Sequence, residues 1–355
     1  MLAAYASAVG GDDPLANLTV GDLPAPEPQP GWARVRVRAA SLNHHDIWTL
    51  RGVSSAPVTP PQILGCDAAG EVDAYGGEPP AGAPPVGARV VVYPIITCGR
   101  CPACLADEPL GCRFFRMLSE PPLGGALAEY VEIPAANLVV LPDQVSFADA
   151  ACLPTAYLTA YRALFVRAAL RPGMNVLVQG ATGGVATACI LLGRLAGITV
   201  YATSRDEAKR AFAVDLGAEA AFPVERETAR AVIGATGGLG VDAVVDTVGE
   251  PTWDLSLRAV RPGGVVVVPG ATGGPNPPAQ LNRIFFRSVT IAGTTMGTRG
   301  ELRRLVDLTA TGALRPLIGS THPLRDAATA FAEMAGGDLR GKIVLDVGAA
   351  ASPVA

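Results

Sequence analysis

The 355-residue sequence predicts an α/β protein with a doubly wound parallel sheet, preceded by a strand-rich, barrel-like domain. From about residue 147 onward, short apolar runs alternate with segments of helical periodicity. These runs are continuously apolar, which indicates strands covered on both faces. Before that point, proline and glycine separate short runs with strict alternation, such as residues 33–38 and 88–93. We therefore expect two domains with different architectures.

The composition is that of a globular protein, with 17% charged and 49% apolar residues. The net charge is -4 and no basic run occurs, so we expect neither nucleic-acid nor membrane partners. The first ten residues lack a charged segment before an apolar one, and no uncharged apolar run reaches the roughly 18 residues of a spanning helix. A cytoplasmic protein with a small-molecule substrate is the expectation.

The second domain is expected over residues 154–294, between a first domain at 1–153 and a return to that domain at 295–355. The expected strands of its sheet are residues 175–179, 198–203, 220–222, 243–246, 264–268 and, last, 288–292. The expected helices are residues 148–166, 184–196, 206–216, 228–235 and 251–259. In the returning segment, we expect a helix at 299–311 and a strand at 341–347.

A glycine-rich loop lies between the first of these strands and the next helix, which is the context of a Rossmann dinucleotide site. Glycines there allow a tight turn and close approach of a pyrophosphate to a helix N-terminus. Ala186 takes the place of the last glycine of the usual pattern. A plain turn is the alternative. The expected cofactor-binding residues of this loop are Gly180, Ala181, Thr182, Gly183, Gly184 and Val185.

The end of the second strand predicts the choice of cofactor. Sites specific for NAD carry an acidic residue here, which binds the ribose 2′-hydroxyl. This sequence has Ser204 and Arg205 instead, followed by Lys209 one helical turn later. One hydroxyl and two cations suit a 2′-phosphate, so we expect NADP(H). The alternative is an ordinary helix start with surface charges.

Four of the seven cysteines lie in one short segment, with the spacing Cys98-x2-Cys101-x2-Cys104-x7-Cys112. This pattern is typical of a structural Zn²⁺ site, in which four thiolates close the tetrahedral shell. An iron–sulfur cluster fits less well, because its bacterial spacing ends in x3. Free buried cysteines are the third possibility. We expect one structural zinc ion per chain, in a lobe at residues 98–112.

Together these features resemble the medium-chain dehydrogenase/reductase superfamily, between zinc alcohol dehydrogenases and quinone-oxidoreductase-like reductases. Four further segments carry the resemblance: Ser41-Leu-Asn-His-His-Asp46, Ile63-Leu-Gly-Cys-Asp-Ala-Ala-Gly70, Pro154-Thr-Ala-Tyr-Leu-Thr-Ala-Tyr161 and Arg340-Gly-Lys342. The resemblance implies a GroES-like catalytic domain, a Rossmann domain, and a dimer or tetramer formed through the last sheet strand. The additional cofactor-binding residues expected are His44, Thr159, Val248, Gly270, Ala271 and Lys342.

In the family, Cys, His and Cys hold a catalytic zinc ion, but the matching places here are Asn43, Cys66 and Thr155, with Asp67 at the nearby acidic place. One soft ligand of three is not a Zn²⁺ site. A rearranged site using Cys66, Asp67 and His45 is the alternative. Without a Lewis acid, the resemblance favours reduction of an activated double bond over alcohol oxidation.

His45 replaces the family's proton-relay hydroxyl and can serve as a general acid, or it only caps a turn or packs beside Trp48. Asp46 is expected to be a structural hydrogen-bond acceptor. Trp48, Phe114 and Tyr157 are candidates for an apolar pocket or for plain core. The catalytic set expected is His45, Asn43, Cys66 and Trp48.

The function expected is an NADPH-dependent reductase of a small enone, quinone or imine/iminium. An alcohol or aldehyde dehydrogenase with unusual site chemistry and a non-catalytic NADPH-binding protein are the alternatives.

Overall fold

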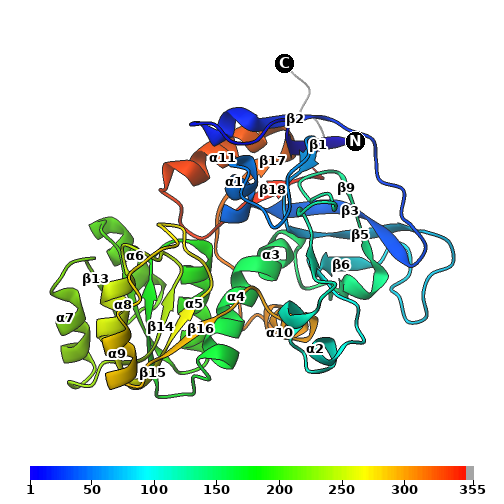
Figure 1. Cartoon of the computed structure of the whole chain (residues 1–355). Coiled ribbons are helices and arrows are strands. Elements are labelled where there is room, and N and C mark those ends of the chain that lie inside the picture. Colours follow the sequence, from blue (N-terminus) through cyan, green and yellow to red (C-terminus); the bar gives the residue numbers. More distant parts are fainter. Residues whose placement is uncertain (349–355) are drawn as a thin grey trace. The chain divides into compact units, whose positions relative to one another are not determined.

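A computed structural model describes residues 1–348, and it divides into two compact units (Figure 1). The first unit contains residues 1–155 and 298–348, and the second contains residues 156–297. Within the described residues, no helix is long and apolar enough to cross a lipid bilayer.

The first unit is built on a seven-stranded sheet in the order β10-β6-β5-β3-β18-β17, with β9 also paired to β3. The strands are β3 (Trp32–Ser41), β5 (Asp67–Tyr75), β6 (Arg89–Val92), β9 (Tyr130–Pro134), β10 (Leu138–Val140), β17 (Ile318–Pro323) and β18 (Lys342–Asp346). A smaller sheet joins β1 (Leu2–Ala6), β2 (Leu18–Asp22) and β4 (Gln62–Ile63). The strand-rich first domain is confirmed.

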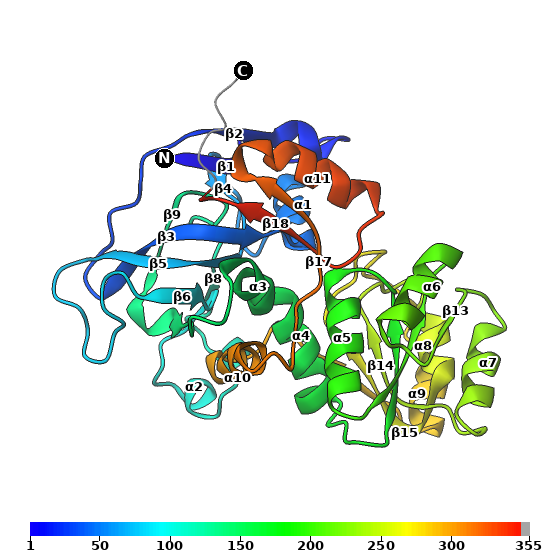
Figure 2. The same ribbon diagram turned by 180° about the vertical axis from the view of Figure 1, so that it is seen from behind.

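The strict alternation in β3 has the expected physical basis. Val35 and Val37 are buried in the core, while Arg34 and Arg38 point to acidic partners on β5. β18 pairs antiparallel with β3, with Val344 opposite Ser41, so the C-terminal strand returns to this sheet as expected (Figure 2).

The second unit contains a six-stranded parallel sheet in the order β13-β12-β11-β14-β15-β16. Its strands are β11 (Asn175–Gln179), β12 (Thr199–Thr203), β13 (Ala220–Phe222), β14 (Val241–Asp246), β15 (Val260–Val268) and β16 (Thr290–Gly293). Its helices are α5 (Gly184–Leu195), α6 (Glu207–Leu216), α7 (Thr228–Ala235), α8 (Trp253–Ala259) and α9 (Leu281–Phe286). Helix α5 packs on α6, while α8 packs on α7 and α9. This is the doubly wound Rossmann sheet that the sequence predicts.

The helix expected at 148–166 differs from the prediction. It begins as α3 (Phe147–Cys152) and contains two π-helical segments, Leu153–Tyr157 and Arg162–Arg167, on either side of α4 (Leu158–Tyr161). Pro154 has no amide hydrogen, so the regular helical bonding pattern cannot continue through it. The π segment places Thr155 at the end of the first unit, where it contacts Asp67.

Two other helices belong to the first unit. Helix α1 (His44–Leu50) follows β3 directly, and α10 (Arg299–Ala310) begins at a capping box between Thr298 and Glu301. The expected helix at 299–311 is confirmed. A further helix, α11 (Ala327–Gly336), follows β17 and was not expected from the sequence.

Candidate functional site

A buried carboxylate, that of Asp67, organises the region where the sequence resembles a catalytic zinc site. Asp67 begins β5 and is fully buried. Its Oδ2 accepts hydrogen bonds from Ser41 Oγ at 3.0 Å and from Asn43 Nδ2 at 2.8 Å. Its Oδ1 accepts from Thr155 Oγ1 at 2.6 Å. Three of the four places of the zinc-site pattern are therefore joined through Asp67, to which Asn43 and Thr155 both donate.

Lys342 completes this group, which we call the Asp67 network. Its ammonium donates to Asn43 Oδ1 at 2.6 Å and to Leu42 O at 2.6 Å, and lies 3.5 Å from Asp67 Oδ2. The side chain is 3% exposed. Lys342 is expected to bind cofactor; in the structure its ammonium faces three acceptors inside the first unit.

Asp46 has the structural role expected. Its Oδ2 accepts from Asn43 N at 2.8 Å, and its Oδ1 accepts from Gly65 N at 3.0 Å. It thereby ties the start of α1 to the segment leading into β5. Burial raises the pKa of Asp46 to about 6, against the opposing effects of His45 and of the Asn43 N–H.

His45 lies between two side chains that are distant from it in the sequence. Its Nε2 is 2.7 Å from Glu120 Oε1, and its Nδ1 is 3.6 Å from Cys66 Sγ. The Cys66 thiol is fully buried and also donates to Leu118 O at 3.4 Å. Histidine, thiol and carboxylate therefore form a row, which we call the Cys66–His45–Glu120 row.

Burial and neighbouring groups shift the pKa values of these three residues in opposite directions. Burial lowers the pKa of His45, but the neighbouring Cys66 and Glu120 outweigh it and raise that pKa well above its ordinary value. Burial raises the pKa of Glu120, yet hydrogen bonds from His45, Ser54 and Ser55 lower it to about 2. Burial raises the pKa of the Cys66 thiol, against the lowering effect of His45.

Trp48 makes its ring contact with the other histidine of α1. The ring that contacts Trp48 edge-on is that of His44, at a centroid distance of 6.0 Å. Tyr157 is fully buried, and Phe114 is half-exposed on the cysteine lobe, where Arg113 lies over its ring. The structure thus places Tyr157 in the core.

A catalytic zinc ion at this place would have to use side chains that already bind other groups of the protein. His45, Asp46 and Cys66 have atoms within 4.8 Å of one another. However, both Asp46 oxygens accept backbone N–H groups and the Nε2 edge of His45 faces Glu120. That leaves one thiol and one ring nitrogen, where a Zn²⁺ site needs at least three protein ligands. Asn43 and Thr155 are committed to Asp67.

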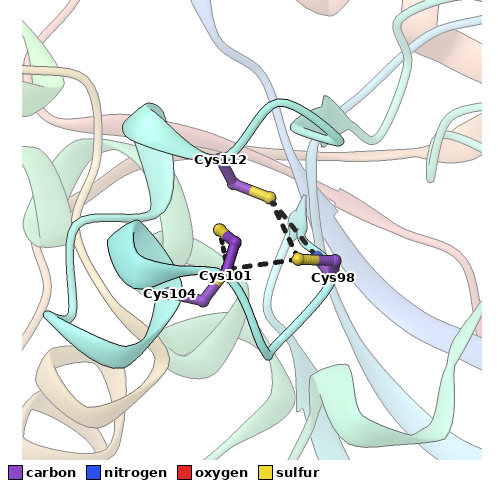
Figure 3. A group of neighbouring side chains, drawn as sticks. All are labelled: Cys98, Cys101, Cys104 and Cys112. Carbon is purple, nitrogen blue, oxygen red and sulfur yellow. Dashed lines mark hydrogen bonds between the residues drawn. The ribbon is translucent and has the colours of Figure 1, made fainter.

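The cysteine lobe does fit a metal. Its sulfurs converge on one centre (Figure 3), with separations of 3.5 Å for Cys101–Cys104, 3.6 Å for Cys98–Cys112 and 3.9 Å for Cys98–Cys104. Four Zn–S bonds of about 2.3 Å in a tetrahedron require edges of about 3.8 Å. Helix α2 (Pro102–Leu105) carries Cys104. A hydrogen bond from the backbone N–H of Arg100 lowers the pKa of the Cys98 thiol to about 6. The lobe can hold a tetrahedral thiolate-bound ion.

The glycine loop lies between β11 and the N-terminus of α5, as the sequence predicts. Gly180 follows β11 with φ of +98°, a value that favours glycine, and its amide donates to Thr203 Oγ1 at 3.3 Å. Gly183 is the N-cap of α5, and a Cβ there would meet no atom within 4 Å. The backbone of Gly180–Val185 thus leads into the N-terminus of a twelve-residue helix.

A buried chain of side chains lies beneath the strand ends of this sheet. Thr203 Oγ1 donates to Gln179 Oε1 at 2.7 Å, and Gln179 Nε2 donates to Ser256 Oγ at 2.9 Å. Ser256 Oγ in turn donates to Asp246 Oδ2 at 2.6 Å. Asp246 Oδ1 accepts from the backbone of Val248 and Gly249 at 3.0 Å each. We call this the Gln179–Asp246 chain, and it joins the ends of β11, β12 and β14.

The expected 2′-phosphate residues lie together after β12. Ser204 is half-buried and Arg205 is exposed. A residue that the sequence reading missed, Arg210, donates from Nη1 to Ser204 O at 2.9 Å and Arg205 O at 3.0 Å. It holds the turn that presents them, while Lys209 N is bound by the N-cap Asp206.

Of the other expected cofactor-binding residues, one lies in the first unit and the rest lie in the second. Val248 follows β14, and Gly273 N donates to Val248 O at 2.7 Å, so the 270–273 segment with Gly270 and Ala271 lies against it. Thr159 is buried on α4. His44 is exposed at the first turn of α1 in the first unit.

Comparison with known proteins places the chain in a family. Residues 29–143 match the alcohol dehydrogenase GroES-like domain, and residues 184–311 match the zinc-binding dehydrogenase domain. A solved NAD-dependent alcohol dehydrogenase is 37% identical, with a TM-score of 0.89, and the match covers 98% of this chain and all of that one.

Two curated relatives are more distant but nearly full-length. An alcohol dehydrogenase of Geobacillus stearothermophilus is 28% identical, covering 93% of this chain and 96% of its own. An acryloyl-coenzyme A reductase of Metallosphaera sedula is also 28% identical, covering 92% and 95%. The chain belongs to the zinc-type alcohol dehydrogenase-like branch of the medium-chain dehydrogenase/reductase superfamily, and it is an oxidoreductase of that type.

Proposed function

We propose that this protein is an NADPH-dependent reductase that adds hydride to a small activated double bond without a catalytic zinc ion. The Asp67 network is the observation that carries this proposal. A carboxylate that accepts from Ser41, Asn43 and Thr155, beside a buried ammonium, is satisfied by protein donors. An alcohol oxidation at neutral pH would need a Lewis acid at this place.

The substrate class follows from what such a site can do. Addition of hydride to the β-carbon of an α,β-unsaturated carbonyl compound leaves an enolate, which needs a proton rather than a metal. His45 is the proton donor in this proposal, because its neighbours favour its charged form. The relative from Metallosphaera sedula is described as an acryloyl-coenzyme A reductase, which acts on this kind of bond. Enones and enoyl thioesters rank first, before quinones and imines.

NADP(H) is the cofactor we propose, and it would supply the hydride. Gly180–Val185 would hold its pyrophosphate, and Ser204, Arg205 and Lys209 would receive its 2′-phosphate. The homologous alcohol dehydrogenase described as NAD-dependent makes NADH the competing choice. At the end of β12, however, this chain offers a hydroxyl and an arginine. A structural zinc ion in the lobe of Cys98, Cys101, Cys104 and Cys112 completes the assignment, and thiolate ligands suit a reducing cytoplasm.

A second copy of this chain is the partner we propose. β16 is the edge strand of the sheet in the second unit, and Ile291 on it is exposed. Beside it in sequence, α9 exposes Leu281, Phe285 and Phe286, the last at 79%. Exposed apolar groups of this size next to a free sheet edge indicate a subunit interface. A dimer or tetramer through this edge is expected.

The test is NADPH consumption over a panel of enones, enoyl thioesters, quinones, cyclic imines and aldehydes, with product identification and no added metal. The proposal expects turnover of an enone or enoyl thioester that persists in a chelator. Alcohol oxidation that requires added zinc would instead support the dehydrogenase alternative. Tight NADPH binding without turnover of any member would support a non-catalytic protein.

A further inference from the structure

The imidazole of His45 is held at both of its nitrogens by groups from distant parts of the chain. Nε2 lies 2.7 Å from Oε1 of Glu120, and Nδ1 lies 3.6 Å from Sγ of Cys66. His45 is on α1, Cys66 precedes β5, and Glu120 follows β8 (Arg116–Met117). The His45 side chain is 14% exposed and that of Glu120 is 10% exposed, so neither is a surface group.

Glu120 is an acceptor held by its own set of donors. Its Oε2 accepts from Ser55 N at 2.9 Å, from Ser55 Oγ at 2.6 Å and from Ser54 Oγ. An ionised carboxylate accepts hydrogen bonds and donates none. Burial opposes the charge, but these donors and His45 lower the pKa of Glu120 to about 2, so it is ionised at neutral pH.

An ionised Glu120 decides which nitrogen of His45 carries hydrogen. Because Oε1 can only accept, Nε2 must be the N–H donor, in the neutral ring as well as in the charged one. The second proton of the ring can then be gained or lost only at Nδ1. The groups that face the ring are Cys66 at Nδ1, Glu120 at Nε2, and Asp46 on the same helix.

We propose that Glu120 is the positioning residue of the proton donor: it holds Nε2–H of His45, so that the proton His45 delivers leaves from Nδ1, on the edge of the ring where Cys66 lies. This inference rests on the proposed role of His45 in the reductase. In the catalytic step, the Nδ1–H bond breaks and its proton forms a C–H or O–H bond on the enolate, leaving a neutral ring. Solvent then reprotonates Nδ1 between turnovers.

The test combines ¹H–¹⁵N spectra of the imidazoles with kinetics. The chain has only three histidines, so His44→Gln and His322→Gln spectra assign His45. In the wild type, the neutral ring must show the Nε2–H tautomer. In Glu120→Gln, which keeps an acceptor but loses the charge, the pKa of His45 should fall by about one unit or more. The alkaline limb of the kcat profile should move by the same amount, while KM for NADPH stays within twofold. Glu132→Gln, on β9, is the matched control and should shift neither.

The outcomes separate this proposal from the proposed function. An Nδ1–H tautomer in the wild type, or an unchanged His45 titration in Glu120→Gln, overturns the role of Glu120. If Glu120→Gln fails to fold, the wild-type tautomer decides alone, because a neutral ring with its hydrogen on Nδ1 cannot donate to Oε1 of Glu120. If the wild type reduces no enone but the tautomer and pKa shift are as expected, the positioning role stands and the reductase assignment fails.

Discussion

The side-chain nitrogen of Asn43 lies 2.8 Å from Oδ2 of Asp67, so two places of the family's zinc-site pattern are bonded directly to each other. The Asn43 amide is engaged at both ends, because its nitrogen donates to this carboxylate and its oxygen accepts from Lys342. The other oxygen of Asp67 accepts from Thr155, so both oxygens of this carboxylate are bound by protein donors. This relationship is the structural basis for assigning protonation without a Lewis acid.

The buried pair of Lys342 and Asp67 predicts a stability effect. Lys342→Met should lower the free energy of unfolding by about 3–5 kcal/mol, because it leaves the Asp67 carboxylate buried without its cation. Urea unfolding of the apo protein measures this change in the free energy of unfolding. The double variant Asp67→Asn/Lys342→Met should lose clearly less than the sum of the two single losses. Additive losses would show that the two groups are energetically independent.

Arg205 predicts a cofactor-specific effect. Arg205→Ala should raise KM for NADPH about 10–100-fold, since a charge-assisted contact to phosphate contributes about 1.5–3 kcal/mol. KM for NADH should change less than threefold, because NADH has no 2′-phosphate. Arg226→Ala, an exposed arginine of the same unit, is the control. Equal losses with both cofactors would remove Arg205 from 2′-phosphate recognition.

The Gln179–Asp246 chain predicts an effect on both cofactors. Gln179→Leu leaves Thr203 and Ser256 without their buried partner, so the strand ends that carry the glycine loop lose their fixed positions. Titration calorimetry should show weaker NADPH and NADH binding by a similar factor, about 5–30-fold for about 1–2 kcal/mol. Unchanged affinity together with lower stability would mean that the chain supports only the fold.

The exposed aromatic residues of α9 predict that the protein forms a dimer or a larger oligomer. Phe286→Glu places a charge on a side chain that is 79% exposed here and, in the proposed dimer, buried. Light scattering after size exclusion should show the wild type as a dimer or larger and the variant shifted towards monomer. Leu239→Glu, a similarly exposed apolar residue outside α9 and β16, is the control. A monomeric wild type contradicts the interface.

Much of the fold could be predicted because its strands are continuous apolar runs between helices. Residues 175–179 and 220–222 are strands with those bounds. β17 was missed because its sequence, IGSTHP, is polar and only half-buried, so it has neither an apolar run nor a clear alternation. Helix α11 was missed because small alanines occupy much of its buried face, and only Phe331 and Met334 mark a stripe.

The site could be predicted in part. Asn43, Cys66, Asp67 and Thr155 follow from matched motifs, and the structure shows that Asn43 and Thr155 both donate to Asp67. Glu120 could not be found, because it lies 75 residues from His45 in a segment without motif or periodicity. The contacts of Lys342 with Leu42 and Asn43 could not be found either, because a motif gives a residue's place in the chain but not the direction in which a long side chain points.

The central claim, that the site works without a catalytic metal ion, is tested most directly by zinc content per chain. The protein as purified, and again after dialysis against excess zinc and gel filtration, should contain one zinc ion, which Cys98→Ser/Cys112→Ser removes and Cys66→Ala leaves in place. Two tightly bound zinc ions per chain, one of them lost in Cys66→Ala, would contradict it.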